Sequence, residues 1–164
     1  MQFGLVGSEM CIRDSASRGG AILGICNGFQ ILTETKLLPG TLIKNSVLKF
    51  LCHDLNVIVQ DTLPSPFTWG FKPTTKLNIP IAHNEGNYYV NCNELKKLIF
   101  NGQIAFKYEE NFNPNGSVEN IAGVLSENGR ILGMMPHPER SVFSHHNSLD
   151  GRLFFQNLIE QLLS

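Results

Sequence analysis

Gly24-Ile25-Cys26-Asn27-Gly28-Phe29-Gln30 links an apolar run at residues 21–25 to a stretch of helical character at residues 27–34. A cysteine between glycines at a strand-to-helix turn is typical of a nucleophile elbow in which sulfur replaces the serine oxygen. We expect that both flanking positions must lack a Cβ, because strand and helix would otherwise clash there. The thiol would lie at a helix N-terminus, where the helix dipole favours a thiolate. The alternative is a small buried structural cysteine, since free cysteine is among the most buried residue types.

A second motif, Met134-Met135-Pro136-His137-Pro138-Glu139-Arg140, follows another apolar run. Pro138 restricts His137 to an extended backbone. Residues i and i+2 of an extended segment share a face, so Glu139 can orient the imidazole of His137. A base held by a carboxylate is what a thiol nucleophile needs. The two motifs together predict a catalytic set of Cys26, His137 and Glu139, rather than a proline-rich surface loop with a chance histidine.

At these residues the chain resembles the class I (triad) glutamine amidotransferases, which carry Gly-x-Cys-x-Gly-x-Gln at the elbow and a late Pro-x-His-Pro-Glu. Within that family it looks like the glutaminase subunits of phosphoribosylformylglycinamidine synthase, which act in purine biosynthesis. The resemblance runs from about residue 19 to the C-terminus. The segments that carry the narrower resemblance are residues 24–32, Leu37-Leu38-Pro39-Gly40, Ile79-Pro80-Ile81-Ala82-His83, Asn113-Pro114-Asn115-Gly116-Ser117 and residues 133–140.

The resemblance implies an α/β fold of the class I glutamine amidotransferase, flavodoxin-like type, with helices on both faces of the sheet. It implies hydrolysis of glutamine to glutamate and ammonia, with Cys26 as nucleophile, His137 as base and Glu139 as its orienter. The backbone N–H after the nucleophile, that of Asn27, is expected to donate to the oxyanion. The remaining substrate-binding residues that we expect are Gly24, Gln30 and His83. For His83 a satisfied histidine at a strand end is an equal alternative.

The resemblance also implies partners. Ammonia would pass to a large ATP-dependent synthetase subunit, aided by a small accessory subunit. ATP and magnesium are expected on the synthetase, because this chain has no GxxxxGK[ST] phosphate loop, and no cofactor is expected here. His145-His146 lacks further ligands at metal spacing, so we expect no metal site. Another hydrolase with the same elbow is a competing interpretation, and the motif at His137 argues against it.

Composition agrees with this picture. The 164 residues match one domain, and a formal charge of −1 suggests neither a nucleic-acid nor a membrane partner. The four cysteines form no CxxC pair or disulfide spacing, which favours reduced thiols and a cytoplasmic location. No apolar stretch approaches the length of a membrane span.

The chain departs from the family in two places. His83-Asn84-Glu85-Gly86 stands where the family has His-Gly-Glu-Gly, a mild change because Asn tolerates a left-handed backbone. Residues 1–16 do not resemble the family N-terminus, and residues 6–15 resemble translated sequencing adaptor. We therefore interpret residues 1–16 as a non-native segment and residues 17–164 as a partial domain without its first strands and a glycine-rich oxyanion loop. A genuine N-terminal extension is the alternative. Weak activity is expected, or else a docking fragment that is inactive or completed by its partner.

Apolar runs alternate with turn residues along the rest of the chain. Asn128-Gly129 predicts a hairpin, and residues 61–69 predict a loop. The predicted strands are residues 21–25, 48–51, 55–60, 76–83, 87–90, 103–108, 121–125 and 130–135. The predicted helices are residues 27–34, 93–99 and 149–163. The phenylalanines predicted in the core are Phe106, Phe112, Phe143, Phe154 and Phe155.

Overall fold

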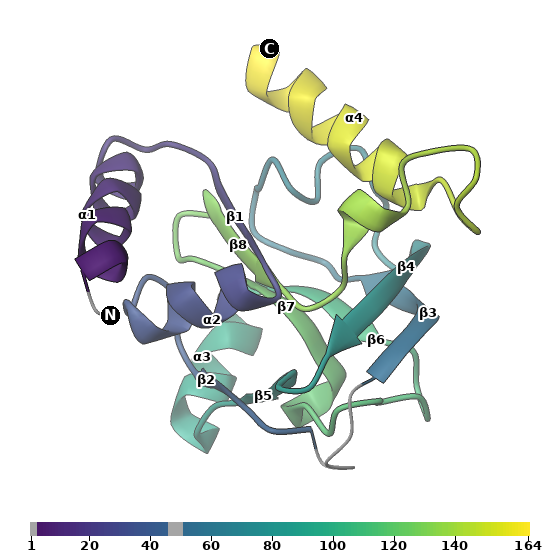
Figure 1. Cartoon of the computed structure of the whole chain (residues 1–164), viewed down its shortest axis with the longest axis horizontal. Coiled ribbons are helices and arrows are strands. Elements are labelled where there is room, and N and C mark those ends of the chain that lie inside the picture. The colour runs from purple at the N-terminus through teal and green to yellow at the C-terminus, as the bar shows by residue number, and fades with distance from the viewer. Residues whose placement is uncertain (1–2, 46–50) are drawn as a thin grey trace.

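The computed structural model describes residues 3–45 and 51–164, and of residues 3–9 it describes the backbone alone. Helices and strands are interspersed along this part of the chain, and α1 and α4 lie near its two ends (Figure 1). The helices are α1 (Phe3–Ser17), α2 (Asn27–Glu34), α3 (Cys92–Phe100) and α4 (Asp150–Leu163), with the short 3-10 helices η1 (Val118–Asn120) and η2 (Pro138–Arg140). The strands are β1 (Ile22–Ile25), β2 (Thr41–Ile43), β3 (Leu51–Val59), β4 (Lys76–His83), β5 (Asn87–Tyr89), β6 (Ile104–Tyr108), β7 (Ile121–Leu125) and β8 (Ile131–Met134).

Six strands form one mixed sheet in the order β1-β8-β7-β6-β3-β4. Strands β1 and β8 are parallel, and every other pair in this sheet is antiparallel. A separate antiparallel pair joins β2 to β5. Because β1 and β8 are parallel neighbours, the segments that follow their carboxyl ends emerge at the same edge of the sheet.

Each face of the main sheet has its own apolar core. On one face the side chains of β3, β4, β6 and β8 pack with Phe154 and Leu158 of α4. On the other face Phe29 and Leu32 of α2 pack with Leu98 of α3 and with strand residues such as Val124. Helices therefore cover both faces, which confirms the predicted α/β architecture.

Two facing glycines let α2 lie close against the sheet. Gly24 of β1 pairs with Gly133 of β8. A Cβ on Gly133 would come within 2.1 Å of the Phe29 ring, and one on Gly24 within 2.4 Å of Leu32. Because neither position has a side chain, α2 can pack closely against the sheet, and this close packing determines where the N-terminus of α2 lies.

Most predicted elements are confirmed to within about two residues, including α2, β4 and the hairpin between β7 and β8, where Gly129 has φ 68°. Part of the strand predicted at residues 48–51 lies outside the described residues. The interruption predicted before residue 55 is wrong, because β3 continues from Leu51 to Val59 and pairs with β4 throughout. Sequence patterns did not indicate β2, which is only three residues long.

The prediction of core phenylalanines is confirmed in part. Phe106 and Phe154 are fully buried, and Phe155 is half-buried against the same core. The prediction is wrong for Phe112 and Phe143, since both lie in loops and are exposed at 50% and 61%. Neither residue belongs to an alternating or helical apolar pattern, which is the signal that distinguishes a core position.

Helix α1 contains residues 3–16 of the segment that we interpret as non-native. Ile12 and Ala16 are half-buried and pack at the edge of the α2-side core, while their described neighbours in this helix are exposed. This contact does not test the origin of residues 1–16, which stays a prediction.

Candidate active site

Cys26 lies on the sharp turn between β1 and α2, as predicted. Its φ is 53° and its ψ is −107°, a conformation that side chains rarely adopt. Its backbone N–H donates to the Met134 carbonyl oxygen at 2.9 Å, which ties the turn to β8. The side chain is half-buried, not sealed in the core as a structural cysteine would be.

Only one of the two flanking glycines is required for space. A Cβ on Gly24 would approach the backbone of Gly28 within 2.8 Å, whereas a Cβ on Gly28 would meet nothing within 4 Å. The expectation that both positions must lack a Cβ is therefore wrong for Gly28. The close approach lies on the β1 side of the turn.

His137 and Glu139 form the predicted pair. Nδ1 of His137 lies 2.6 Å from Oε1 of Glu139, and the backbone N–H of His137 donates to the Pro80 carbonyl oxygen at 2.8 Å. A carboxylate at Nδ1 fixes the proton on that nitrogen when the ring is neutral. Nε2 of His137 is then the basic nitrogen, and it is buried with no hydrogen-bond partner among the described residues.

The electrostatics of His137 connect it to both other members of the set. Burial acts to lower its pKa, but interactions with Cys26 and Glu139 outweigh burial and raise the pKa to about 9. Burial also acts to raise the pKa of Glu139, and the hydrogen bond to His137 reverses this and lowers it.

The sheet topology explains why Cys26 and His137 meet. Cys26 follows the end of β1, His137 follows the end of β8, and these two strands are parallel neighbours. Strand β4 also borders the site, because Sγ of Cys26 lies 4.0 Å from the Ala82 carbonyl oxygen. Residues far apart in the sequence thus converge at one edge of the sheet.

His83 lies in this neighbourhood, at the end of β4. It is 3% exposed, and its Nε2 lies 3.0 Å from Nδ2 of Asn115. Burial and then the nearby His137 lower the pKa of His83 to about 4, so His83 is neutral at pH 7. Asn84, beside it, does not have a positive φ, so asparagine in place of the family glycine needs no left-handed backbone here.

Two residues that sequence reasoning did not propose join His83. Asn115 is fully buried, and its Nδ2 contacts the hydroxyl of Tyr108 at 3.0 Å and the Gly86 carbonyl oxygen at 2.6 Å. Burial raises the pKa of Tyr108 above its usual range, and the negative charge of a Cys26 thiolate acts in the same direction. The turn residues 113–117 were the only signal for Asn115, and turn chemistry alone does not predict a buried amide.

The other predicted substrate-binding residues are placed as follows. Asn27 begins α2, so its backbone N–H is one of the donors that a helix N-terminus leaves without an intrahelical partner. This is consistent with an oxyanion donor beside Cys26. Gln30 is one turn further along, and its Nε2 donates to Oε1 of Glu34 at 2.9 Å.

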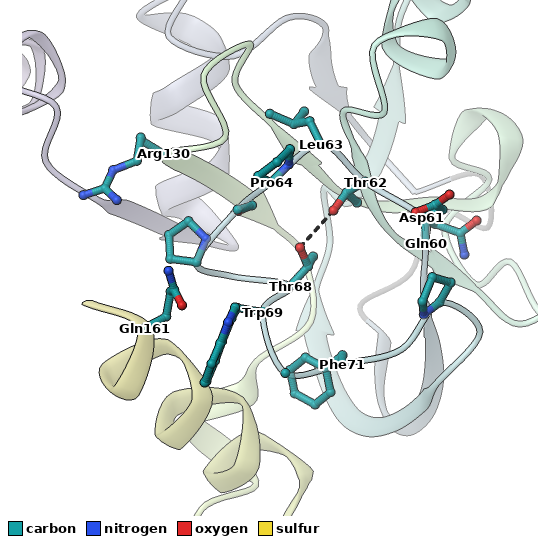
Figure 2. A pocket seen from close by; sticks show the side chains of 14 residues that line it. Gln60, Asp61, Thr62, Leu63, Pro64, Thr68, Trp69, Phe71, Arg130 and Gln161 are labelled. Atoms are coloured by element: carbon teal, nitrogen blue, oxygen red, sulfur yellow. Dashed lines mark hydrogen bonds between the residues drawn. The ribbon is translucent and has the colours of Figure 1, made fainter. Parts of the chain in front are cut away.

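Two cavities lie elsewhere. One of about 510 Å³ lies between the loop at residues 60–73 and α4, where the Thr62 and Thr68 hydroxyls are hydrogen-bonded (Figure 2). It includes Arg130, at the end of β8 opposite His137. The other, about 1030 Å³, lies between α1 and α3. Neither cavity is lined by Cys26, His137 or Glu139.

Among the side chains that the structure describes, those of residues 10–45 and 51–164, no group of three or more His, Cys, Asp or Glu could hold a metal ion. In the same ranges no helix is long and apolar enough to cross a membrane. All four cysteines are free thiols.

A cysteine on a strained elbow, with a carboxylate-bound histidine in an α/β fold, is the arrangement expected of a triad glutamine amidotransferase. The chain belongs to the family of CobB/CobQ-like glutamine amidotransferase domains, which matches residues 11–156.

Within that family it is similar to proteins called phosphoribosylformylglycinamidine synthase subunit PurQ. It is 47% identical over 149 residues to the one from Bartonella henselae, covering 91% of this chain and 66% of that protein. It is 46% identical over 144 residues to the one from Brucella abortus, covering 88% and 64%. The chain thus spans somewhat less than two thirds of the length of these relatives.

Solved structures agree on the fold. A chain in the structure of PurLQS from Thermotoga maritima is 39% identical, with a TM-score of 0.83 over 97% of this chain and 72% of that one. A putative GMP synthase protein from Thermoplasma acidophilum has a TM-score of 0.60 at 19% identity over 95% of this chain and 62% of that one, which shows the fold alone.

Proposed function

We propose that this chain is the glutaminase component of a phosphoribosylformylglycinamidine synthase. It hydrolyses glutamine to glutamate and ammonia, and the ammonia serves purine biosynthesis. The observation that carries the proposal is Cys26 on the elbow at the end of β1, beside His137 and its 2.6 Å contact with Glu139. The similarity to PurQ proteins supports the choice of pathway.

The geometry supports a mechanism through a thioester. Sγ of Cys26 attacks the side-chain amide carbon of glutamine, and Nε2 of His137 holds the thiol proton. The backbone N–H of Asn27 donates to the oxygen that becomes negative. His137 then gives its proton to the departing ammonia, and water releases glutamate from the thioester. Glu139 holds the imidazole in one orientation and stabilises its protonated form.

The proposal includes partners. Ammonia passes to a large ATP-dependent synthetase subunit, with a small accessory subunit, and ATP and magnesium belong to the synthetase. The similarity to a chain of PurLQS from Thermotoga maritima supports an assembly of this kind. A cytoplasmic location goes with this role.

Replacement of the nucleophile tests the function. We expect Cys26→Ala to abolish glutaminase activity, measured as glutamate release, because no other group in the site can form the thioester. Cys92 is the matched control, since it is exposed at the start of α3, and Cys92→Ala should leave activity unchanged.

A covalent label gives a second readout that does not need full turnover. A diazoketone analogue of glutamine should modify Cys26 and not Cys92, as detected by peptide mass spectrometry. Normal glutamate release by Cys26→Ala, or no preference of the analogue for Cys26, would contradict the proposed function.

A further inference from the structure

The turn that joins β4 to β5 is enclosed by buried polar side chains. Asn45 donates to the His83 carbonyl oxygen at 3.0 Å and accepts from the Gly86 N–H at 2.8 Å. On the other side, Asn115 and Ser117 both donate to the Gly86 carbonyl oxygen, at 2.6 Å and 3.2 Å. Side chains from two distant segments therefore hold the backbone of this turn, and with it the ring of His83.

The contacts of Asn115 determine its orientation. Because the Gly86 carbonyl oxygen only accepts hydrogen bonds, the Asn115 atom 2.6 Å from it must be the amide nitrogen. The same nitrogen lies 3.0 Å from Nε2 of His83. An amide nitrogen has no lone pair to offer, so a proton on Nε2 would place two donors face to face.

This orientation determines the tautomer of His83. Nε2 must be the unprotonated nitrogen, and the ring proton of neutral His83 lies on Nδ1. The charged group that acts on His83 is His137, after β8, and Tyr108 on β6 contacts Asn115 rather than His83. Burial and the charge of His137 keep the ring neutral, since they lower its pKa to about 4.

Three buried polar side-chain atoms have no hydrogen-bond partner among the described residues: Nδ1 of His83, Oδ1 of Asn115 and Nε2 of His137. Buried polar atoms are nearly always hydrogen-bonded, so each of these requires an explanation. The mechanism accounts for Nε2 of His137. The other two are a donor and an acceptor on side chains that contact each other, which suits a ligand that carries both kinds of group.

We propose that Asn115 is a positioning residue of the glutamine site, which locks His83 as the Nδ1–H tautomer so that His83 offers bound substrate a neutral hydrogen-bond donor beside Cys26. This inference rests on the proposed function for the identity of the ligand. It does not rest on that function for the tautomer. Gly86 is part of the same arrangement. A Cβ there would lie 2.1 Å from the His83 ring, so only glycine leaves room for the ring in this position.

Ring nitrogen NMR of the histidines tests the tautomer directly. His83→Gln identifies the His83 signals by their loss. We expect the wild-type protein to show the Nδ1–H form of His83 at neutral pH. Asn115→Asp should move the proton to Nε2, because a carboxylate accepts where the amide donated. Tyr108→Phe keeps the Asn115–His83 contact and should leave the tautomer unchanged. An Nε2–H form in the wild-type protein would overturn the proposal, whether or not the Asn115 variant folds.

Glutamine binding tests the role of the donor. In a Cys26→Ala background, which prevents turnover, calorimetry should show glutamine binding that Asn115→Asp weakens about tenfold, because one hydrogen bond to the ligand is lost. Ser117→Ala is the control, since it removes a contact to the same carbonyl oxygen, and the acceptor of the Tyr88 N–H, without touching His83. Its Kd should stay within about twofold.

Equal weakening by both variants would show a general loosening of the turn and overturn the positioning role. An unchanged Kd in Asn115→Asp would mean that water, not glutamine, satisfies Nδ1 of His83, and would also overturn it. Absence of any glutamine binding with the Nδ1–H tautomer in place would instead count against the proposed function.

Discussion

Cys26 has a positive φ that an unstrained side chain avoids, and the surrounding contacts hold it there. Its N–H is bonded to β8, and its carbonyl oxygen accepts from the N–H of Gln30 at 3.2 Å, within the first turn of α2. Strain of this kind persists only where the structure over-determines the backbone. The carboxylate of Glu139 likewise sets the roles of the two nitrogens of His137. It holds the proton on Nδ1, which makes Nε2 the basic nitrogen.

Glu139→Gln tests that coupling. The amide keeps the shape of the side chain but loses the charge that helps to raise the pKa of His137 to about 9. We expect a lower pKa for His137 in ring NMR titrations, and kcat/KM for glutamine lower by at least about tenfold. Glu85→Gln is the control, since Glu85 is an exposed carboxylate two residues after His83. An unshifted His137 titration in Glu139→Gln would show that Glu139 does not set its basicity.

At the scale of elements, the site depends on the unit formed by β1, α2 and β8. Parallel pairing of β1 with β8 brings the ends of both strands together, and Gly24 with Gly133 lets α2 approach the sheet. The two conspicuous glycines of the elbow motif have different roles in this unit. Gly24 is enclosed by Leu32 and the Gly28 backbone, while the Gly28 position faces open space.

Alanine at these two positions should therefore have opposite effects on stability. Gly24→Ala forces the helix away from the strand and should lower the free energy of unfolding by about 1–3 kcal/mol. Gly28→Ala lies within α2 and should raise it by about 0.5–1 kcal/mol, because alanine favours the helix. Urea unfolding followed by circular dichroism measures both. A similar loss in the two variants would contradict the contacts described for Gly24.

At the scale of the whole molecule, two histidines near the site change stability in opposite directions with pH. The pKa of His137 is raised to about 9, so the protonated ring stabilises the fold below its unfolded value of 6.5, and this contribution is lost as pH rises to about 9. The pKa of His83 is lowered to about 4, so the unfolded chain binds a proton first, and stability falls as pH drops from 6.5 to about 4.

We therefore expect the free energy of unfolding to be greatest near pH 6.5, with His83 contributing to the acidic decline and His137 to the alkaline one. Urea unfolding across this range measures it. His137→Gln should remove the decline on the alkaline side and also reduce that on the acidic side, because the charge of His137 is the second cause of the lowered His83 pKa. His83→Gln should reduce the acidic decline and leave the alkaline one. A profile that either variant leaves unaltered would show that the corresponding ring has an ordinary pKa in the folded protein.

Much of this protein could be predicted from its sequence, because the informative signals are local. A nucleophile elbow, a proline-bounded His-x-Glu pair and an Asn-Gly hairpin each specify geometry within a few residues. Apolar runs bounded by turn residues likewise located β4 and β7 with their bounds unchanged. The prediction of Cys26, His137 and Glu139 as the catalytic set rests on these local signals.

Long-range packing was decided only by the tertiary structure. The burial of Asn115 against His83 and Tyr108, the open space at Gly28 and the exposure of Phe112 and Phe143 depend on which segments meet across the sheet. No residue pattern encodes those meetings, because each results from the pairing and twist of strands far apart in the chain. Local residue patterns thus specified the candidate site and most of the elements, and the fold specified which polar neighbours surround that site.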